Sequence, residues 1–142
     1  MIPTALILDD EPHLLSWLEE YLIAKGLRVR FATDVAGAIG LLESETFRVL
    51  VLDLNVPAPG DYQELLKSRG YLYVEYRGLY VAEYARTLGY RDRQVIVYSV
   101  HDVDAVRAIT DKIGITYCVK GRPRSFKAEI DDVLSYDPSD QR

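Results

Sequence analysis

The chain of 142 residues is long enough to bury the core of one globular domain and is short for two. Its net charge of −5 argues against a general nucleic-acid or membrane-surface binder, and no apolar run approaches the roughly 20 residues of a spanning helix. A single cysteine cannot form an internal disulfide and the first residues lack a secretory signal, so a cytoplasmic location is expected.

The first half of the chain alternates predicted strands and helices. Residues 4–8 form an apolar strand, and apolar positions with helical spacing follow it up to a stop at Gly26. A strand with one wetter face is expected at residues 29–31, and Asp34 is expected to cap the next helix. Residues 49–52 indicate a strand buried on both faces. This order predicts a parallel sheet with right-handed crossovers.

The same alternation of predicted helices and strands resumes after residue 77. A helix from Gly78 to Gly89, a strand over 94–99, a helix over 102–112, a strand over 115–119 and a last helix capped by Ser125 are expected. Five strand–helix units predict the α/β class, as a three-layer doubly wound (βα)5 flavodoxin-like sheet with strand order 2-1-3-4-5. We expect residues 1–142 to form one domain.

Polar side chains directly follow the predicted strands: Asp9, Asp10, Asp53, Ser99 and Lys120. Because the carboxyl ends of parallel strands lie on one edge of the sheet, these side chains are expected to gather there. Three adjacent carboxylates repel one another unless a cation lies among them, and oxygen ligands without histidine or cysteine favour Mg²⁺. Together with the lysine charge and the serine hydroxyl, the cluster predicts phosphoryl transfer to Asp53 acting as a nucleophile.

Each of these residues also has a simpler interpretation when it is taken alone. Asp9 and Asp10 could cap the first helix, which is a common task of aspartate. Tyr117 could be an ordinary strand aromatic, and Cys118 is expected to be a small core residue. The few basic residues near Arg122 are typical of a solvated loop.

With these residues in place, nearly the whole sequence resembles the receiver domain of two-component response regulators. The acidic pair of that family matches Asp9 and Asp10, and its phosphoacceptor matches Asp53, with the family's proline at Pro57. The lysine after the fifth strand matches Lys120.

The resemblance implies roles for further residues. The backbone carbonyl of Asn55 would complete a Mg²⁺ shell formed with Asp9, Asp10 and Asp53. Ser99 and Tyr117 match the two switch positions, and His101 occupies a position that tunes the loss of phosphate in the family. On phosphorylation, Ser99 would move toward Asp53 and Tyr117 would turn inward. This would repack the surface of the fourth helix, the fifth strand and the fifth helix.

The resemblance also implies partners. A sensor histidine kinase or a histidine phosphotransfer protein would donate phosphate to Asp53 in a Mg²⁺-dependent reaction, and a downstream protein would recognise the result. Such a cytoplasmic phosphoprotein is not a conventional enzyme, because it catalyses only its own phosphorylation and dephosphorylation. No direct nucleic-acid or membrane partner is expected, and a homodimer is compatible with the resemblance. Because the sequence ends at Arg142, a stand-alone switch is expected, with a fragment of a longer protein as the alternative.

The largest departure from the family pattern is a tyrosine-rich insertion at residues 58–77, between Pro57 and Gly78. A helix over 61–69, capped by Asp61 and stopped by Gly70, and then a strand over 71–76 are expected. Two interpretations stay open. The insertion is either an elaborated loop that covers the third helix, or a lid over Asp53 or partner-recognition surface.

Two smaller departures concern the chemistry. Val100 stands where the family has a very small residue, so it is expected to narrow the approach to Asp53 and to slow phosphorylation by small donors. Gly121 replaces a proline that the family has in a cis bond. A cis bond before glycine costs about 2.5–4 kcal/mol, so a trans bond or a rearranged loop is expected, with consequences for how Lys120 is aimed.

Two alternative functions stay open, of which the first is suggested by these departures. A degenerate receiver would act as a phosphorylation-independent protein-interaction module. A phosphatase of the haloacid-dehalogenase type would also use Asp53 as a nucleophile, but Asn55 stands where that family needs a second aspartate.

Overall fold

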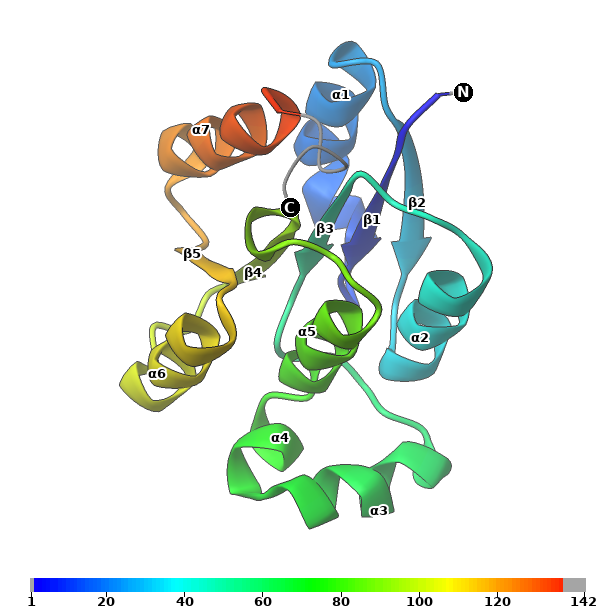
Figure 1. Cartoon of the computed structure of the whole chain (residues 1–142), viewed down its shortest axis with the longest axis vertical. Coiled ribbons are helices and arrows are strands. Elements are labelled where there is room, and N and C mark those ends of the chain that lie inside the picture. The colour runs from blue at the N-terminus through cyan, green and yellow to red at the C-terminus, as the bar shows by residue number, and fades with distance from the viewer. Residues whose placement is uncertain (1, 137–142) are drawn as a thin grey trace.

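A single five-stranded parallel sheet organises the protein, whose computed structural model describes residues 2–136 (Figure 1). The strand order is β2-β1-β3-β4-β5, which confirms the expected flavodoxin-like fold class. The strands are β1 (Thr4–Leu8), β2 (Arg28–Ala32), β3 (Val49–Leu52), β4 (Val95–Ser99) and β5 (Thr116–Val119).

Helices cover both faces of this sheet. They are α1 (Ser16–Ala24), α2 (Val35–Ser44), α3 (Gly60–Arg69), α4 (Tyr71–Glu75), α5 (Gly78–Thr87), α6 (Asp104–Ile113) and α7 (Pro123–Leu134), with short 3₁₀ turns at Pro12–Leu15 and Asp92–Gln94. Helices α1 and α7 pack on one face, and α2, α5 and α6 pack on the other. None of the helices in residues 2–136 is both long and apolar enough to cross a membrane.

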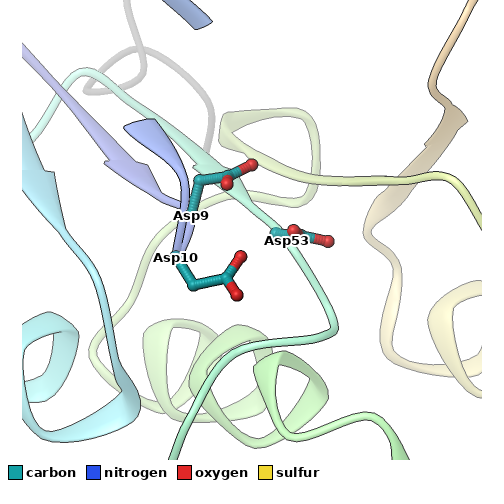
Figure 2. Close-up of side chains that lie close together, drawn as sticks. All are labelled: Asp9, Asp10 and Asp53. Atoms are coloured by element: carbon teal, nitrogen blue, oxygen red, sulfur yellow. The ribbon is translucent and has the colours of Figure 1, made fainter. Parts of the chain in front are cut away.

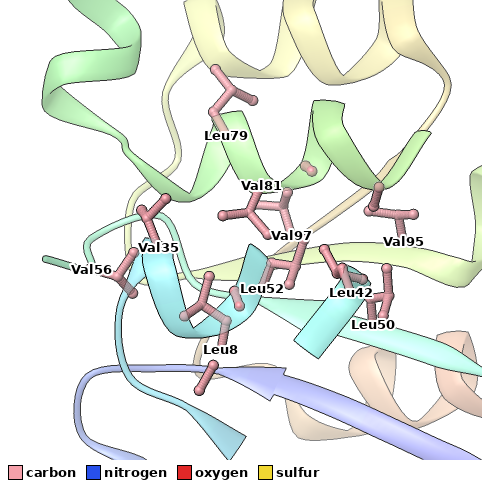
Figure 3. Packing of buried hydrophobic residues seen from close by; sticks show 14 of the residues in the cluster. Leu8, Val35, Leu42, Leu50, Leu52, Val56, Leu79, Val81, Val95 and Val97 are labelled. Carbon is pink, nitrogen blue, oxygen red and sulfur yellow. The ribbon is translucent and has the colours of Figure 1, made fainter. Parts of the chain in front are cut away.

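Side-chain alternation along the strands divides the core into two halves. Leu8, Leu50 and Leu52 point toward α2 and α5 (Figure 3), whereas Ile7 and Val51 point toward α1 and α7. Such central strands are buried on both faces, as the uninterrupted apolar run of β3 predicted. Cys118 packs in the second half of the core, and burial raises the pKa of its thiol to about 11.

The insertion departs from the predicted secondary structure. The expected strand over 71–76 is wrong, because Tyr71–Glu75 forms helix α4. A helix places Leu72, Tyr73 and Tyr76 on one side, where all three pack against the core of the α5 face. A strand would have put Leu72 and Tyr73 on opposite faces, so tertiary packing overrides the strand propensity of these residues.

The prediction that Ser125 caps the last helix is also wrong. Helix α7 begins at Pro123, two residues earlier, with Arg122 at the cap position. Proline suits the first turn of a helix because its missing N–H would have no partner there. Ser125 is therefore a residue of the helix itself.

Of the two aspartates predicted to cap helices, Asp34 does so and Asp61 does not. The Asp34 carboxylate accepts a hydrogen bond of 2.7 Å from the amide of Gly37, which confirms the predicted cap of α2. The predicted cap by Asp61 is wrong, because α3 begins at Gly60, Pro59 takes the cap position, and Asp61 already lies in the first turn. The predicted stop of α3 at Gly70 is confirmed: this residue has a φ of +123°, which favours glycine.

We therefore expect Asp34→Ala to lower the free energy of unfolding by about 1 kcal/mol, the usual cost of losing a cap. The matched change Asp61→Ala should alter it by less than about 0.5 kcal/mol, as is usual for surface substitutions. Urea unfolding of both variants measures the difference. Equal losses in the two variants would contradict the assignment of the caps.

Candidate functional site

Two buried aspartates stand at the carboxyl ends of neighbouring central strands. Asp9 follows β1 and Asp53 follows β3, and their amides continue the sheet ladder by donating to the carbonyls of Ala32 (3.0 Å) and Leu8 (2.9 Å). Alternation points Asp9 and Asp53 to the face that α1 and α7 cover. The exposed fraction is only 3% for Asp9 and 8% for Asp53.

Asp10 completes a cluster of three carboxylates with these two residues. One carboxylate oxygen from each of Asp9, Asp10 and Asp53 lies within 4.8 Å of the other two. Figure 2 shows the three carboxylates pointing into the same space beyond the strand ends. Asp10 is exposed, so this space is open to solvent on its side.

Lys120 brings a positive charge to this cluster. Its ammonium lies 2.8 Å from Asp9 Oδ2 and 3.4 Å from Asp53 Oδ2. The Lys120 amide also donates to the Ser99 carbonyl at 2.7 Å, which fixes the end of β5 beside β4. Burial alone would lower the pKa of Lys120, but the hydrogen bond to Asp9 and the charges of Asp53 and Asp9 raise it above its ordinary value.

The surroundings of Asp53 favour its neutral form. Burial raises the pKa of this carboxyl, the charge of Lys120 opposes the rise, and the charge of Asp9 adds to it. The Oδ1 atom accepts the amide of Leu54 at 2.8 Å, whereas Oδ2 faces Lys120. The two oxygens of Asp53 are therefore inequivalent, with Oδ2 as the one beside a cation.

The donor set fits a hard divalent cation. Three carboxylates with convergent oxygens, and no histidine or cysteine among them, are ligands of the kind that Mg²⁺ binds. Such an ion would lower the repulsion among these carboxylates, which Lys120 neutralises only in part. The simpler interpretation of Asp9 as a helix cap fails, since its Oδ1 accepts the amide of Glu11 at 2.8 Å while no side chain caps either helical segment that follows.

Ser99 and Tyr117 both form hydrogen bonds with the loop after β4. The buried Ser99 hydroxyl accepts the amide of His101 at 3.2 Å. The Tyr117 hydroxyl donates to the His101 carbonyl and accepts the amide of Val103 at 3.3 Å. The Arg107 guanidinium lies 4.5 Å from the Tyr117 ring centroid, and burial raises the pKa of this tyrosine.

Three other predicted residues lie at the margin of the site. Asn55 is exposed, and its amide is 3.5 Å from Asp53 Oδ1. Val100 is 66% exposed, and its effect on access to Asp53 stays a prediction. The residues from 2 to 136 contain no cis peptide bond, so the expected trans bond before Gly121 is confirmed.

Two residues important to the geometry were missed by sequence reasoning. Gly78 was expected only to open a helix, yet its amide donates to the Leu54 carbonyl at 3.0 Å and its Cα lies against the Asp53 backbone. Tyr98 was read only as part of a strand, but the Lys120 ammonium lies 5.6 Å from its ring centroid. Strand alternation could have found Tyr98, since it pairs with Cys118 and Lys120 follows two residues later on the same face.

The insertion packs on α5 through a cluster of aromatic and charged side chains. The Arg69 guanidinium pairs with Glu83 at 3.1 Å and lies 5.4 Å from the Tyr80 ring centroid. Tyr62 also contacts Tyr80, at 6.3 Å between centroids. This matches the interpretation of an elaborated loop over that helix, and the roles as a lid or as a partner surface stay predictions. Figure 1 places α3 and α4 at the end toward which the strands point.

Helix α4 also reaches the loop after β4. The Tyr76 ring, which directly follows this helix, makes an edge contact of 5.8 Å between centroids with His101. His101 is the residue whose carbonyl accepts the Tyr117 hydroxyl and whose amide donates to Ser99. The insertion is therefore in contact with the loop that joins the two predicted switch residues.

Solved structures similar to this chain include response regulators and receiver domains of response regulators. A CheY-like receiver domain protein from Methanospirillum hungatei JF-1 matches with a TM-score of 0.75 and 18% identity, covering 100% of both chains. The response regulator TrrA from Thermotoga maritima, solved in complex with Mg²⁺-BeF, matches with a TM-score of 0.67 and 19% identity, covering 93% of this chain and 99% of that one. The BeF3-activated receiver domain of RstA from Klebsiella pneumoniae matches with a TM-score of 0.71 and 15% identity, covering 94% and 99%.

Sequence comparison gives a shorter match. The transcriptional regulatory protein TctD of Salmonella typhimurium is 34% identical over 67 residues, which is 46% of this chain. The match spans 30% of the length of TctD. No protein-family model matches the chain.

Proposed function

We propose that this chain, whose fold is the receiver fold of response regulators, is a phosphoacceptor switch that accepts a phosphoryl group on Asp53. The observation that carries the proposal is the meeting of the Asp9, Asp10 and Asp53 oxygens within 4.8 Å, with the Lys120 ammonium 3.4 Å from Asp53 Oδ2. A carboxylate nucleophile, a set of oxygen donors for a hard cation and a fixed ammonium are the groups that phosphoryl transfer requires.

The donor would be a phosphohistidine of a sensor histidine kinase or of a phosphotransfer protein. Asp53 Oδ2 attacks phosphorus, because Oδ1 is held by the Leu54 amide. The new O–P bond forms as the P–N bond to the imidazole breaks, and the imidazole nitrogen keeps the electron pair and takes a proton from water. Lys120, already beside Oδ2, binds a phosphoryl oxygen as the charge arrives.

Asp9, Asp10 and Asp53, with the Asn55 carbonyl completing the set, would hold Mg²⁺. Bound there, the ion supplies charge neutralisation for the phosphoryl oxygens and for the carboxylates. Asp53 forms the covalent bond to phosphorus, and Lys120 orients the phosphoryl group. Beyond this self-phosphorylation and the later hydrolysis, we assign the chain no reaction on a separate substrate.

The phosphoryl group would be sensed through the loop after β4. The Ser99 hydroxyl now accepts the His101 amide, and turning toward a phosphoryl oxygen breaks that bond. The loop can then move, so that Tyr117 gives up its hydrogen bonds to His101 and Val103 and turns inward. Because Tyr76 contacts His101, the change in the loop also reaches the end of α4. We therefore propose that the surface read by a downstream protein includes the insertion in addition to α6.

Beryllofluoride with Mg²⁺ tests this function, because it mimics a phosphoryl group on a carboxylate. Trp17, the only tryptophan, is linked to the site through Phe126 and Tyr98, so its fluorescence should change on binding. We expect a saturable change in the wild-type protein, loss of the change in Asp53→Asn, and retention in Asp61→Asn, an exposed carboxylate of the insertion. The absence of wild-type binding would favour the degenerate receiver instead.

A further inference from the structure

An aromatic face lies beneath the ammonium of Lys120. The Lys120 Nζ is 5.6 Å from the centroid of the Tyr98 ring, within the roughly 6 Å reach of a cation–π interaction. Tyr98 is only 3% exposed, so little water competes for that face. The same ammonium extends from this ring to Asp9 and Asp53, which makes the ring a third contact of Lys120.

Further aromatic rings hold Tyr98 in place. Its ring stacks on Phe126 of α7 with centroids 4.0 Å apart and an interplanar angle of 18°. Phe126 is fully buried and makes a T-shaped contact with Trp17, at 6.1 Å between ring centroids. A buried ring stacked on a buried side chain of α7 cannot turn aside, so it offers Lys120 a fixed surface.

The chain after Lys120 offers no comparable constraint. Gly121 is exposed and has a φ of +95°, and within the described part of the chain no atom beyond its chain neighbours lies within 4 Å of the position where a Cβ would stand. Lysine has a flexible four-carbon stem, and holding its ammonium at one place costs rotamer entropy. The Lys120 ammonium is therefore placed by its contacts with Asp9, Asp53 and the Tyr98 ring, and not by the loop that follows.

We infer that Tyr98 is a positioning residue, whose ring face directs the Lys120 ammonium to the oxygen of Asp53 that receives the phosphoryl group. This inference rests on the proposed function. The ring makes no contact with the phosphoryl group and acts only through Lys120. The face of the ring is what matters, because it carries the negative end of the quadrupole, and the hydroxyl is dispensable.

Two substitutions separate the ring from its hydroxyl. Tyr98→Phe keeps the face, so its affinity for beryllofluoride with Mg²⁺ should stay within about twofold of the wild type. Tyr98→Leu keeps an apolar side chain but removes the face, so its affinity should fall by about 3- to 30-fold. Phe47→Leu, which removes a buried ring from the opposite half of the core, serves as the control for general destabilisation.

Nuclear magnetic resonance without metal or beryllofluoride reads the contact itself. Ring current should move the Lys120 ε-methylene protons upfield of those of Lys67, whose ammonium lies over no ring within the described part of the chain. The shift should persist in Tyr98→Phe and vanish in Tyr98→Leu. This measurement needs no variant to detect the contact, so an unshifted Lys120 would overturn the inference even if Tyr98→Leu does not fold.

The results separate the inference from the proposed function. An unshifted Lys120 in the wild type, equal affinities of Tyr98→Leu and wild type, or a loss in Tyr98→Phe as large as in Tyr98→Leu would each overturn the positioning role. A wild-type protein that shows the ring-current shift but binds no beryllofluoride would instead overturn the phosphoacceptor function and leave the contact established.

Discussion

Gly78→Ala is expected to lower the free energy of unfolding by about 2–3 kcal/mol, which is the upper part of the range for overpacking a close-packed site. A Cβ at this position would overlap the Asp53 carbonyl oxygen and lie 2.8 Å from its carbonyl carbon. These atoms belong to the backbone and cannot rotate away as a side chain would. The first turn of α5 would have to move from β3, and Asp53 would move with it.

Urea unfolding measures this loss, and Gly40→Ala supplies a control of opposite sign. Gly40 lies in α2, where no atom of residues 2–136 outside the neighbouring turns of the helix lies within 4 Å of an added Cβ. Alanine there should raise the free energy of unfolding by about 0.5–1 kcal/mol, because it improves helix propensity. If Gly78→Ala were as stable as the wild type, the close approach of α5 to Asp53 would be refuted.

Lys120→Met is expected to destabilise the protein at neutral pH without divalent cations. The change leaves the buried Asp9 and Asp53 carboxylates without their shared cation. Breaking a fully buried pair costs about 3–5 kcal/mol, and we expect about 1–3 kcal/mol because the Lys120 side chain keeps 21% exposure. Lys67→Met, which removes an exposed pair with Glu64, should cost less than about 0.5 kcal/mol.

The cost of Lys120→Met should depend on pH in a definite direction. Burial already raises the pKa of Asp53, and removing the lysine charge raises it further. A carboxyl with a raised pKa in the folded protein favours folding at pH values below its unfolded pKa of about 3.9 and loses that contribution as the pH rises through the folded value. The deficit of the variant should therefore be largest at pH 7 and shrink as the pH falls. A deficit that stays constant would show that lost packing, and not charge, is responsible.

The framework of the fold was predictable because its signals are local. The apolar run of β3 and the cap of α2 by Asp34 depend on a few neighbouring residues, and both follow the expectation. The gathering of carboxylates follows from topology alone, since the ends of parallel strands share an edge. The positions of Asp9, Asp53 and Lys120 directly after their strands therefore predict that these residues lie together.

The insertion was mispredicted because its structure depends on distant partners. Tyr71–Glu75 has the composition of a strand, but Leu72 and Tyr73 can both pack on the same core only if the segment is helical. Tyr76 and His101 are in contact although they lie 25 positions apart in the sequence (101 − 76), and no local sequence pattern predicts this contact. Likewise, the approach of Gly78 to Asp53 depends on how an entire helix packs against a strand.

The acceptor role of Asp53 is tested most directly by incubating the protein with acetyl phosphate and Mg²⁺ and measuring its intact mass. The expected result is the addition of one phosphoryl group, which borohydride reduction maps to Asp53 and which is absent in Asp53→Asn. No added mass under these conditions, or a phosphoryl group that maps to any other residue, would contradict it.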